Sequence, residues 1–259
     1  MADPLPKKWT ALKPNEPLEA HRVYGTHLLY YKIAAQPGAT LSAEIEPRDD
    51  VVLSVDGKFV QGTPDKYQKQ ITFTLPGDAK EVVALYENRG HYNYKNVMEL
   101  PVGLCAMRVT TENLPLEISE GGTNGKERDY SLALSRNAVQ IADAGWKPVA
   151  IETNAAAATD ALLTWYRMQC ELPAPKPGVW GPWHLHLEAN GNGFIYVNGR
   201  CIGRNWQAGP QHDFYIPETW LNFGEGKTNT IVLNLRPLDK GVCVQAARMQ
   251  PASSFAEFR

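Results

Sequence analysis

The sequence predicts an all-β protein of the sandwich or barrel class. Three observations lead to this prediction: short strand-like segments recur along the chain, two Asx-Gly hairpins lie among them, and few windows show helical periodicity. The best helical window, 154–163, is Ala-rich and short. We interpret it as a loop or as one to two helical turns.

The expected strands are short and are separated by turn residues. We expect them over 27–33, 51–55, 70–75, 81–86, 104–110, 130–134, 183–188, 193–197 and 230–235. Many short strands at regular spacing are typical of sandwiches and barrels.

Two segments predict β-hairpins with a two-residue turn. Residues 51–60 hold Asp56-Gly57 between apolar strands, and residues 193–202 hold Asn198-Gly199 in the same place. Asx-Gly tolerates the positive φ that both central positions of a type I′ turn require. The hairpins lie about 140 residues apart, which is the span of one domain, so we interpret them as a weak internal repeat.

The segment 119–125, Ser-Glu-Gly-Gly-Thr-Asn-Gly, has the clearest linker composition between the two hairpins. We therefore predict two domains, a first β-sandwich over 1–124 and a second over 125–259 that carries the sequence VNGRCIGRNW. Six of the seven tryptophans lie in the second half, which gives that half the larger aromatic surface.

Composition excludes several classes of protein. The 259 residues carry a formal net charge of -2 with scattered Lys and Arg, so we expect neither a nucleic acid nor a membrane as partner. The first eight residues lack the apolar run of a secretory signal. The four cysteines lack CxxC spacing, which favours small buried residues over a zinc site, although disulfides stay possible.

The second half resembles the β-galactosidases of glycoside hydrolase family 35. The resemblance lies in Val197-Asn-Gly-Arg-Cys-Ile-Gly-Arg-Asn-Trp206, in Gly209-Pro-Gln211, in Phe214-Tyr-Ile-Pro217 with Trp220-Leu221, and upstream in Leu163-Thr-Trp-Tyr166. Accessory jelly rolls of rhamnosidases and of family 2 glycoside hydrolases share the first of these stretches.

The first half resembles the same family in order along the chain. Tyr24-Gly25 to Lys32 is similar to the start of the first jelly roll after the catalytic barrel, and Glu87-Asn88-Arg-Gly90 to Tyr94 is similar to a later segment. Asn205 and His91 depart from the family pattern, where Tyr and Arg are usual. The resemblance implies two jelly-roll β-sandwiches, similar to galactose-binding domains, without the barrel that carries the two catalytic carboxylates.

The resemblance also implies carbohydrate, an oligo- or polysaccharide, as the ligand. An indole can stack on a pyranose while amides and guanidinium groups bond its hydroxyls. The candidate sugar contacts are Trp180, Trp183, Arg204, Trp206, Gln211, His91 and Tyr94. The alternative for Arg204 and Trp206 is a structural corner, with the Trp packed on the sandwich and the Arg paired to a carboxylate. The loop around His91 and Tyr94 fits a sugar site and an interface with a barrel equally.

Metal binding is a further possibility. His184, His186 and Glu188 share one face of a predicted strand, where they could hold a metal or form a polar outer face. We expect no cofactor. A structural Ca²⁺ could use acidic loop residues such as Asp49 and Asp50, as jelly rolls of this kind often do.

The sequence thus predicts a carbohydrate-binding or accessory module, without hydrolase activity of its own, for plant-type or galactose-containing glycans. The alternative is a structural C-terminal part or subunit of a β-galactosidase-type glycoside hydrolase that packs on a catalytic barrel. An enzyme in its own right is the third hypothesis. We expect an extracellular or periplasmic location if the chain derives from a secreted enzyme, and a cytoplasmic one otherwise.

Overall fold

The computed structural model describes most of the two predicted sandwiches. The described residues are 5, 7, 9–12, 16–21, 28–34, 36–44, 50–62, 70–88, 106–109, 112–113, 116–120, 161–176, 181–238 and 241–251. Over these residues the chain forms antiparallel β-strands and short 3₁₀ helices, and no α-helix. No helix in this part of the chain has the length and apolar character needed to span a membrane.

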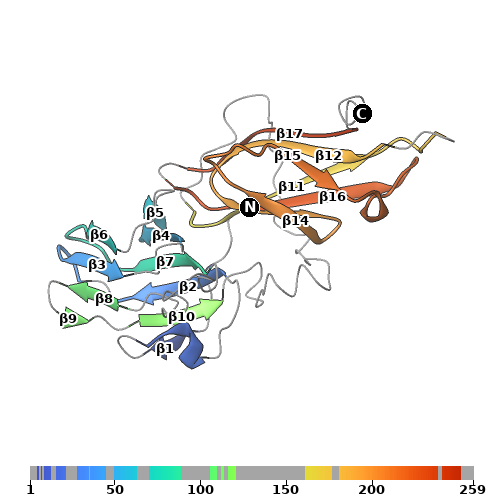
Figure 1. The fold of residues 1–259 in the computed structure, drawn as a ribbon. Helices are drawn as coiled ribbons and strands as arrows, with labels where there is room; N and C mark the ends of the chain where they lie inside the picture. The colour runs from blue at the N-terminus through green and yellow to red at the C-terminus, as the bar shows by residue number, and fades with distance from the viewer. Residues whose placement is uncertain are drawn as a thin grey trace, which may run out of the picture.

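In its described residues, the first sandwich contains ten strands and one short 3₁₀ helix. They are β1 (Thr10–Leu12), η1 (Leu18–His21), β2 (Leu28–Ile33), β3 (Thr40–Glu44), β4 (Asp50–Val55), β5 (Lys58–Gly62), β6 (Gln70–Thr74), β7 (Val82–Glu87), β8 (Ala106–Val109), β9 (Glu112–Asn113) and β10 (Leu116–Glu120). One sheet has the order β1-β10-β2-β7-β4-β5 and the other the order β6-β3-β8-β9. Figure 1 shows these blue-to-green strands gathered as one body.

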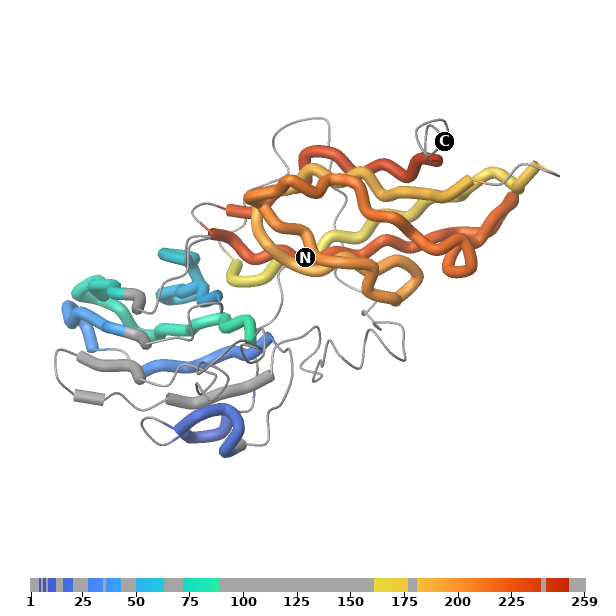
Figure 2. The backbone as a smooth tube through the Cα atoms, in the orientation of Figure 1, coloured from blue at the N-terminus to red at the C-terminus, as the bar shows by residue number. Residues whose placement is uncertain are grey.

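The part of the second sandwich that the structure describes contains seven strands. They are β11 (Thr164–Glu171), β12 (Trp183–Asn190), β13 (Gly193–Val197), β14 (Arg200–Asn205), β15 (Asp213–Ile216), β16 (Thr228–Leu235) and β17 (Cys243–Pro251), with η4 (Glu218–Trp220) before β16. The sheets have the orders β11-β16-β13-β14 and β15-β12-β17. Figure 2 follows the same backbone as a tube, with the yellow-to-red second sandwich beside the first.

The prediction of two jelly-roll β-sandwiches is confirmed. The predicted strands that lie in the described residues agree with the observed ones to within two residues; Ala106–Val109 is the described part of 104–110, and 183–188 extends to Asn190. The predicted strand at 130–134 lies outside the described residues, and so does most of the 154–163 window. The boundary between residues 124 and 125 also lies outside them and stays a prediction.

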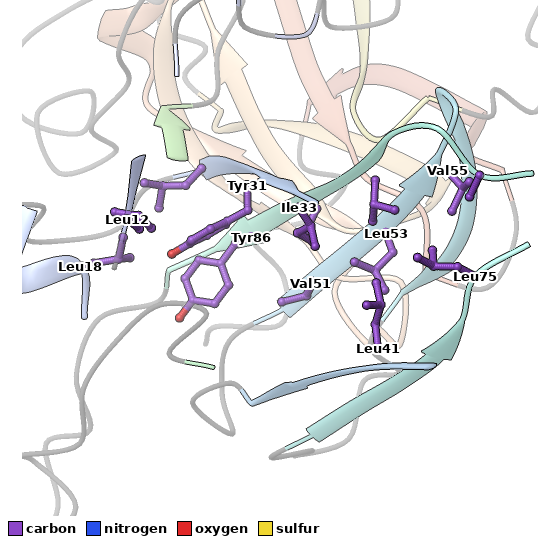
Figure 3. Packing of buried hydrophobic residues seen from close by; sticks show 14 residues of the cluster. Leu12, Leu18, Tyr31, Ile33, Leu41, Val51, Leu53, Val55, Leu75 and Tyr86 are labelled. Atoms are coloured by element: carbon purple, nitrogen blue, oxygen red, sulfur yellow. The ribbon is translucent and has the colours of Figure 1, made fainter. Parts of the chain in front are cut away.

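Each sandwich has its own apolar core between its two sheets. In the first, Tyr31 of β2 and Tyr86 of β7 meet edge to face with centroids 5.8 Å apart, among leucines and valines of both sheets (Figure 3). In the second, Leu185 and Leu187 of β12 pack against the apolar face of β16. Alternation of inward and outward side chains along each strand produces these cores.

Both predicted hairpins form as expected. Asp56 and Gly57 have φ of 49° and 77°, and Asn198 and Gly199 have φ of 47° and 79°, the signs that a type I′ turn requires. Each hairpin also has a register shift, between Leu53 and Ser54 in one and between Ile195 and Tyr196 in the other. The internal repeat is therefore visible in the backbone as well as in the sequence.

The strands next to the hairpins follow the same plan. Val55 and Val197 precede the two turns, and their partners on the neighbouring strands are Val82 and Ile231. At the far end of the same strand pairs, Asp50 lies opposite Glu87, and Asn192 lies opposite Arg236. The series β2-β7-β4-β5 thus corresponds to the series β11-β16-β13-β14.

Candidate functional site

The two corresponding sheets pack against each other through their outer faces. A buried apolar cluster joins Leu28 and Tyr30 of β2, with Leu85 of β7, to Trp165 of β11 and Tyr196 of β13. Trp165 is fully buried and stacks on Tyr196 with ring centroids 6.4 Å apart. We call this contact between the sandwiches the junction. Because the second sandwich covers their outer face, β2, β4 and β7 are buried on both sides.

Four charged side chains lie at one edge of the junction. Arg236 follows β16 and is 1% exposed, and its Nε donates to Glu87 Oε2 at 2.8 Å. Its Nη2 also pairs with Asp50. Arg204 of β14 adds a second guanidinium, with Nη2 2.8 Å from Glu87 Oε1 and 3.4 Å from Asp50 Oδ2.

The first sandwich thus supplies two carboxylates to this edge, and the second supplies two guanidinium groups. Removing one partner would leave a buried charge without compensation, which is much more costly than losing an exposed ion pair. These four residues therefore tie the two sandwiches together.

Arg204 also connects this charge cluster to the tryptophan of the VNGRCIGRNW stretch. Its guanidinium lies over the Trp206 ring at 4.3 Å and near the Phe194 ring at 5.8 Å. A guanidinium between aromatic faces and carboxylates is well held by cation–π and ionic contacts together. Arg204 and Trp206 therefore have a structural role at the junction, and a sugar contact for them stays a prediction.

The residues beside Trp206 fix the end of the hairpin. The buried Asn205 donates from Nδ2 to the Gly191 carbonyl at 2.8 Å. Gln207 accepts from the Gly191 N–H through Oε1 at 2.6 Å, and its own N–H donates to Asn192 Oδ1 at 2.8 Å. Gly191 has a φ of +95°, and a Cβ there would lie 2.6 Å from the Arg236 carbonyl oxygen. The side chains of this stretch thus hold a close backbone corner.

The other predicted sugar contacts lie apart from this corner. Trp183 begins β12, is half-buried on the core side of its sheet, and meets Phe223 at 6.1 Å. Gln211 is exposed and donates to the Asp213 carbonyl at 3.2 Å. Trp180, His91 and Tyr94 lie outside the described residues. Four of the seven are described, and of these Arg204 and Trp206 contact each other.

The outer face of the three-stranded sheet carries the histidines singled out in the sequence. The face consists of residues that neighbour one another across β15, β12 and β17: Tyr215, Asp213, His184, His186, Glu188, Gln250 and Arg248. We call it the polar face. His186 lies between two carboxylates, with Nδ1 3.0 Å from Asp213 Oδ1 and Nε2 3.3 Å from Glu188 Oε1.

The same contacts set the protonation of His186. The hydrogen bond to Asp213 is the main cause that raises the pKa of His186 above its usual value, and the hydrogen bond to Glu188 adds to it, while desolvation opposes both. The imidazolium is therefore favoured, with one carboxylate against each ring nitrogen.

Metal ligands are not assembled in the part of the chain that is described: no group of three or more His, Cys, Asp or Glu residues there could hold an ion. Asp50, a candidate calcium ligand, pairs with Arg236 and Arg204. The calcium site stays a prediction. Cys170, Cys201 and Cys243 are free thiols, and Cys105 lies outside the described residues.

Sequence reasoning missed the carboxylates and the second arginine of the junction. Glu87 and Arg236 are 149 positions apart and carry no local pattern, so nothing in the sequence pairs them. A signal for the junction does exist, because 28–31, 51–53 and 82–86 are unbroken apolar or aromatic runs. Such runs are typical of strands covered on both faces, whereas alternation is typical of strands with one wet face.

Fold and junction define a class of protein: two antiparallel β-sandwiches of one plan, joined through corresponding sheets. A family model described as "Beta-galactosidase, galactose-binding domain" matches residues 163–229, which include all of β11 to β15. The resemblance to the galactose-binding-like domains of family 35 β-galactosidases is confirmed by this match and by the relatives below.

Curated relatives are named as β-galactosidase-like proteins. Mouse "Beta-galactosidase-1-like protein 3" is 34% identical over 64 residues, which are 25% of this chain and 9% of the mouse protein. The human protein of that name is 29% identical over 146 residues, which are 56% of this chain and 19% of the human protein. The match therefore spans less than a fifth of the length of these relatives.

Among solved structures, a lectin from Pleurotus ostreatus in complex with GalNAc aligns with 97% of this chain and 81% of its own, at 13% identity and a TM-score of 0.24. A TM-score this low does not indicate a shared arrangement, so the lectin's sugar has no bearing on this chain.

Proposed function

We propose that this chain is a carbohydrate-binding accessory module related to β-galactosidases, without hydrolase activity of its own, and that it binds galactose-containing or plant-type glycans. The match of residues 163–229 to the galactose-binding domain is the observation that carries the proposal. Of the predicted sugar contacts, Trp183 and Gln211 lie outside the junction and keep part of their surface exposed. We retain them as candidate contacts at the rim of the second sandwich.

The direct test is a binding screen with the whole chain. Galactans, xylans and β-glucans should be offered in affinity gels and on a glycan array, and at least one galactose-containing glycan should retard the chain. We expect an affinity roughly in the micromolar to millimolar range, because a shallow sugar site buries little area. A chain that binds none of these glycans would contradict the proposal.

A parallel assay tests the absence of catalysis. The pure chain should release no chromophore from an aryl β-galactoside over hours of incubation. Steady hydrolysis that a single Asp or Glu substitution abolishes would instead make the chain an enzyme.

A second candidate function is structural: the chain would be a C-terminal part or subunit that packs on a catalytic barrel. The length of the relatives favours it, since the matched part is 9% of the mouse protein and 19% of the human protein. The two candidates differ in what the chain binds. If the chain co-elutes with a separately produced β-galactosidase barrel and binds no glycan, the structural function is supported and the binding function fails.

A further inference from the structure

The polar face of the three-stranded sheet has the composition of a shallow sugar site. Strand β12 turns Leu185 and Leu187 into the core and leaves His184, His186 and Glu188 on the other side. The strand register places His184 between Tyr215 and Gln250, and His186 between Asp213 and Arg248. One aromatic ring thus lies among side chains that donate and accept hydrogen bonds.

Tyr215 is the aromatic element of this face. It is 50% exposed, which makes it the most exposed large apolar side chain among the described residues. Its ring is held in place, because the hydroxyl donates to Glu218 Oε2 at 3.2 Å and the His184 ring meets it edge to face at 6.2 Å. An exposed ring with a fixed orientation can stack on the C–H face of a pyranose at a small cost in conformational entropy.

Asp213 and Glu188 are the acceptors of this face. Both side chains are about half exposed, and His186 holds one oxygen of each. Gln250 Nε2 also donates to Asp213 Oδ1, at 3.4 Å. A carboxylate can accept about four hydrogen bonds, so both keep capacity to accept from sugar hydroxyls in a fixed direction.

We infer that the polar face, centred on Tyr215 with Asp213, Glu188 and Gln250, binds a neutral galactose-containing oligosaccharide. The inference rests on the proposed function and assigns it a surface. The face is opposite to the junction sheet, so a sugar can reach it while the two sandwiches stay joined. A protein partner fits less well, because protein interfaces have an apolar centre and this face has one exposed ring among polar and charged groups.

Affinity electrophoresis in gels containing soluble β-galactan tests the inference, with xylan and mixed-linkage β-glucan gels run beside it. Three variants of the whole chain are compared with the parent: Tyr215→Ala, Tyr215→Phe and the control Val60→Ala. Val60 is an exposed apolar residue of β5 in the first sandwich, at 36% exposure. Thermal unfolding of each variant shows that it is folded.

We expect Tyr215→Ala to weaken galactan binding about tenfold, because loss of a stacked ring is worth on the order of 1 kcal/mol or more. Tyr215→Phe keeps the ring and should stay within about threefold of the parent, and Val60→Ala should match the parent. If the parent binds and Tyr215→Ala binds equally well, the polar face is not the site, although the proposed function stands. If the parent binds no glycan, the proposed function fails and the inferred site fails with it.

Discussion

The two sandwiches use the same hairpin plan but place opposite chemistry at its corresponding positions. Glu87 of the first sandwich corresponds to Arg236 of the second, and the two side chains bond to each other. Gly62 corresponds to Arg204, so one hairpin offers a bare backbone where the other offers a guanidinium. A shared backbone plan can therefore form a junction with itself when the charges on its two copies are complementary.

The two sheets of the second sandwich also differ, in what covers their outer faces. The sheet that contains the VNGRCIGRNW stretch is covered by the first sandwich, and the three-stranded sheet presents a polar outer face. The VNGRCIGRNW stretch thus supports the junction, through the ion pairs of Arg204 with Glu87 and Asp50.

The largest effect is expected from breaking the apolar part of the junction. Trp165→Ala should lower the free energy of unfolding by about 3–5 kcal/mol, because a fully buried indole between the sandwiches is replaced by a cavity. Urea unfolding followed by circular dichroism measures this loss. Tyr215→Ala is the matched control, since half of that side chain is exposed, and it should cost under about 1 kcal/mol. Equal losses would contradict a stabilising role for the Trp165 indole at the junction.

A smaller effect is expected from adding one carbon at Gly62, where the backbones of the two sandwiches come close. A Cβ on Gly62 would lie 2.7 Å from the carbonyl oxygen and 3.2 Å from the Cα of Leu238, both of which are backbone atoms. Gly62→Ala should therefore cost about 1–3 kcal/mol in thermal unfolding. Gly77→Ala meets nothing within 4 Å and should be neutral. A Gly62→Ala chain as stable as the Gly77→Ala chain would contradict the contact.

Substitution in the more buried turn should cost more stability than substitution in the exposed turn. Asn198 donates to the Trp220 carbonyl at 2.6 Å and accepts from the Thr230 N–H at 2.9 Å, in a half-buried setting. Asp56 accepts from the N–H groups of Lys80 and Glu81, at 3.1 and 2.9 Å, in an exposed one. Asn198→Gly should cost about 2 kcal/mol and Asp56→Gly about 1 kcal/mol, because water replaces lost partners better at an exposed site.

Glycine is the right substitute in both turns, since it accepts the positive φ without strain. Thermal unfolding of the two variants provides the comparison. A larger loss for Asp56→Gly than for Asn198→Gly would reverse the expected order.

The smallest effect concerns pH. The pKa of His186 is raised in the folded chain by Asp213 first and Glu188 next, so protonation stabilises the folded state. This contribution is fully present below the unfolded pKa of about 6.5 and is lost as pH rises through the raised folded pKa. Between these two pKa values, the melting temperature of His186→Gln should fall less steeply with rising pH than that of the parent. Melting curves of parent and variant that stay parallel across this interval would contradict the ion pairs.

Local features were predictable from the sequence, because they depend on neighbouring residues. Asx-Gly turns need positive φ at two adjacent positions, and both turns formed where Asp56-Gly57 and Asn198-Gly199 predicted them. The outward position of His184 and His186 likewise followed from strand alternation. The family resemblance predicted that the second sandwich is similar to a galactose-binding domain, and the match at 163–229 supports this prediction.

The junction was not predictable in the same way, because its partners are distant in sequence. Asp50 and Arg236 are 186 positions apart, and strand alternation states which face a side chain takes without stating what covers that face. Arg204 shows the consequence. An arginine beside Trp206 suits a sugar site, whereas the structure pairs its guanidinium with Glu87 and Asp50. Tyr215 was overlooked as a candidate because its exposure depends on the sheet pairing.

The most direct test of the junction is a double-mutant cycle between Glu87→Gln and Arg236→Met, measured by urea unfolding. Each single variant leaves the buried cluster of four charges with one charge uncompensated and should lose about 3–5 kcal/mol. The double variant should lose less than the sum, with a coupling energy of at least about 1.5 kcal/mol. Losses that add to within about 0.5 kcal/mol would show that the two residues do not interact, and would contradict a junction built on their charges.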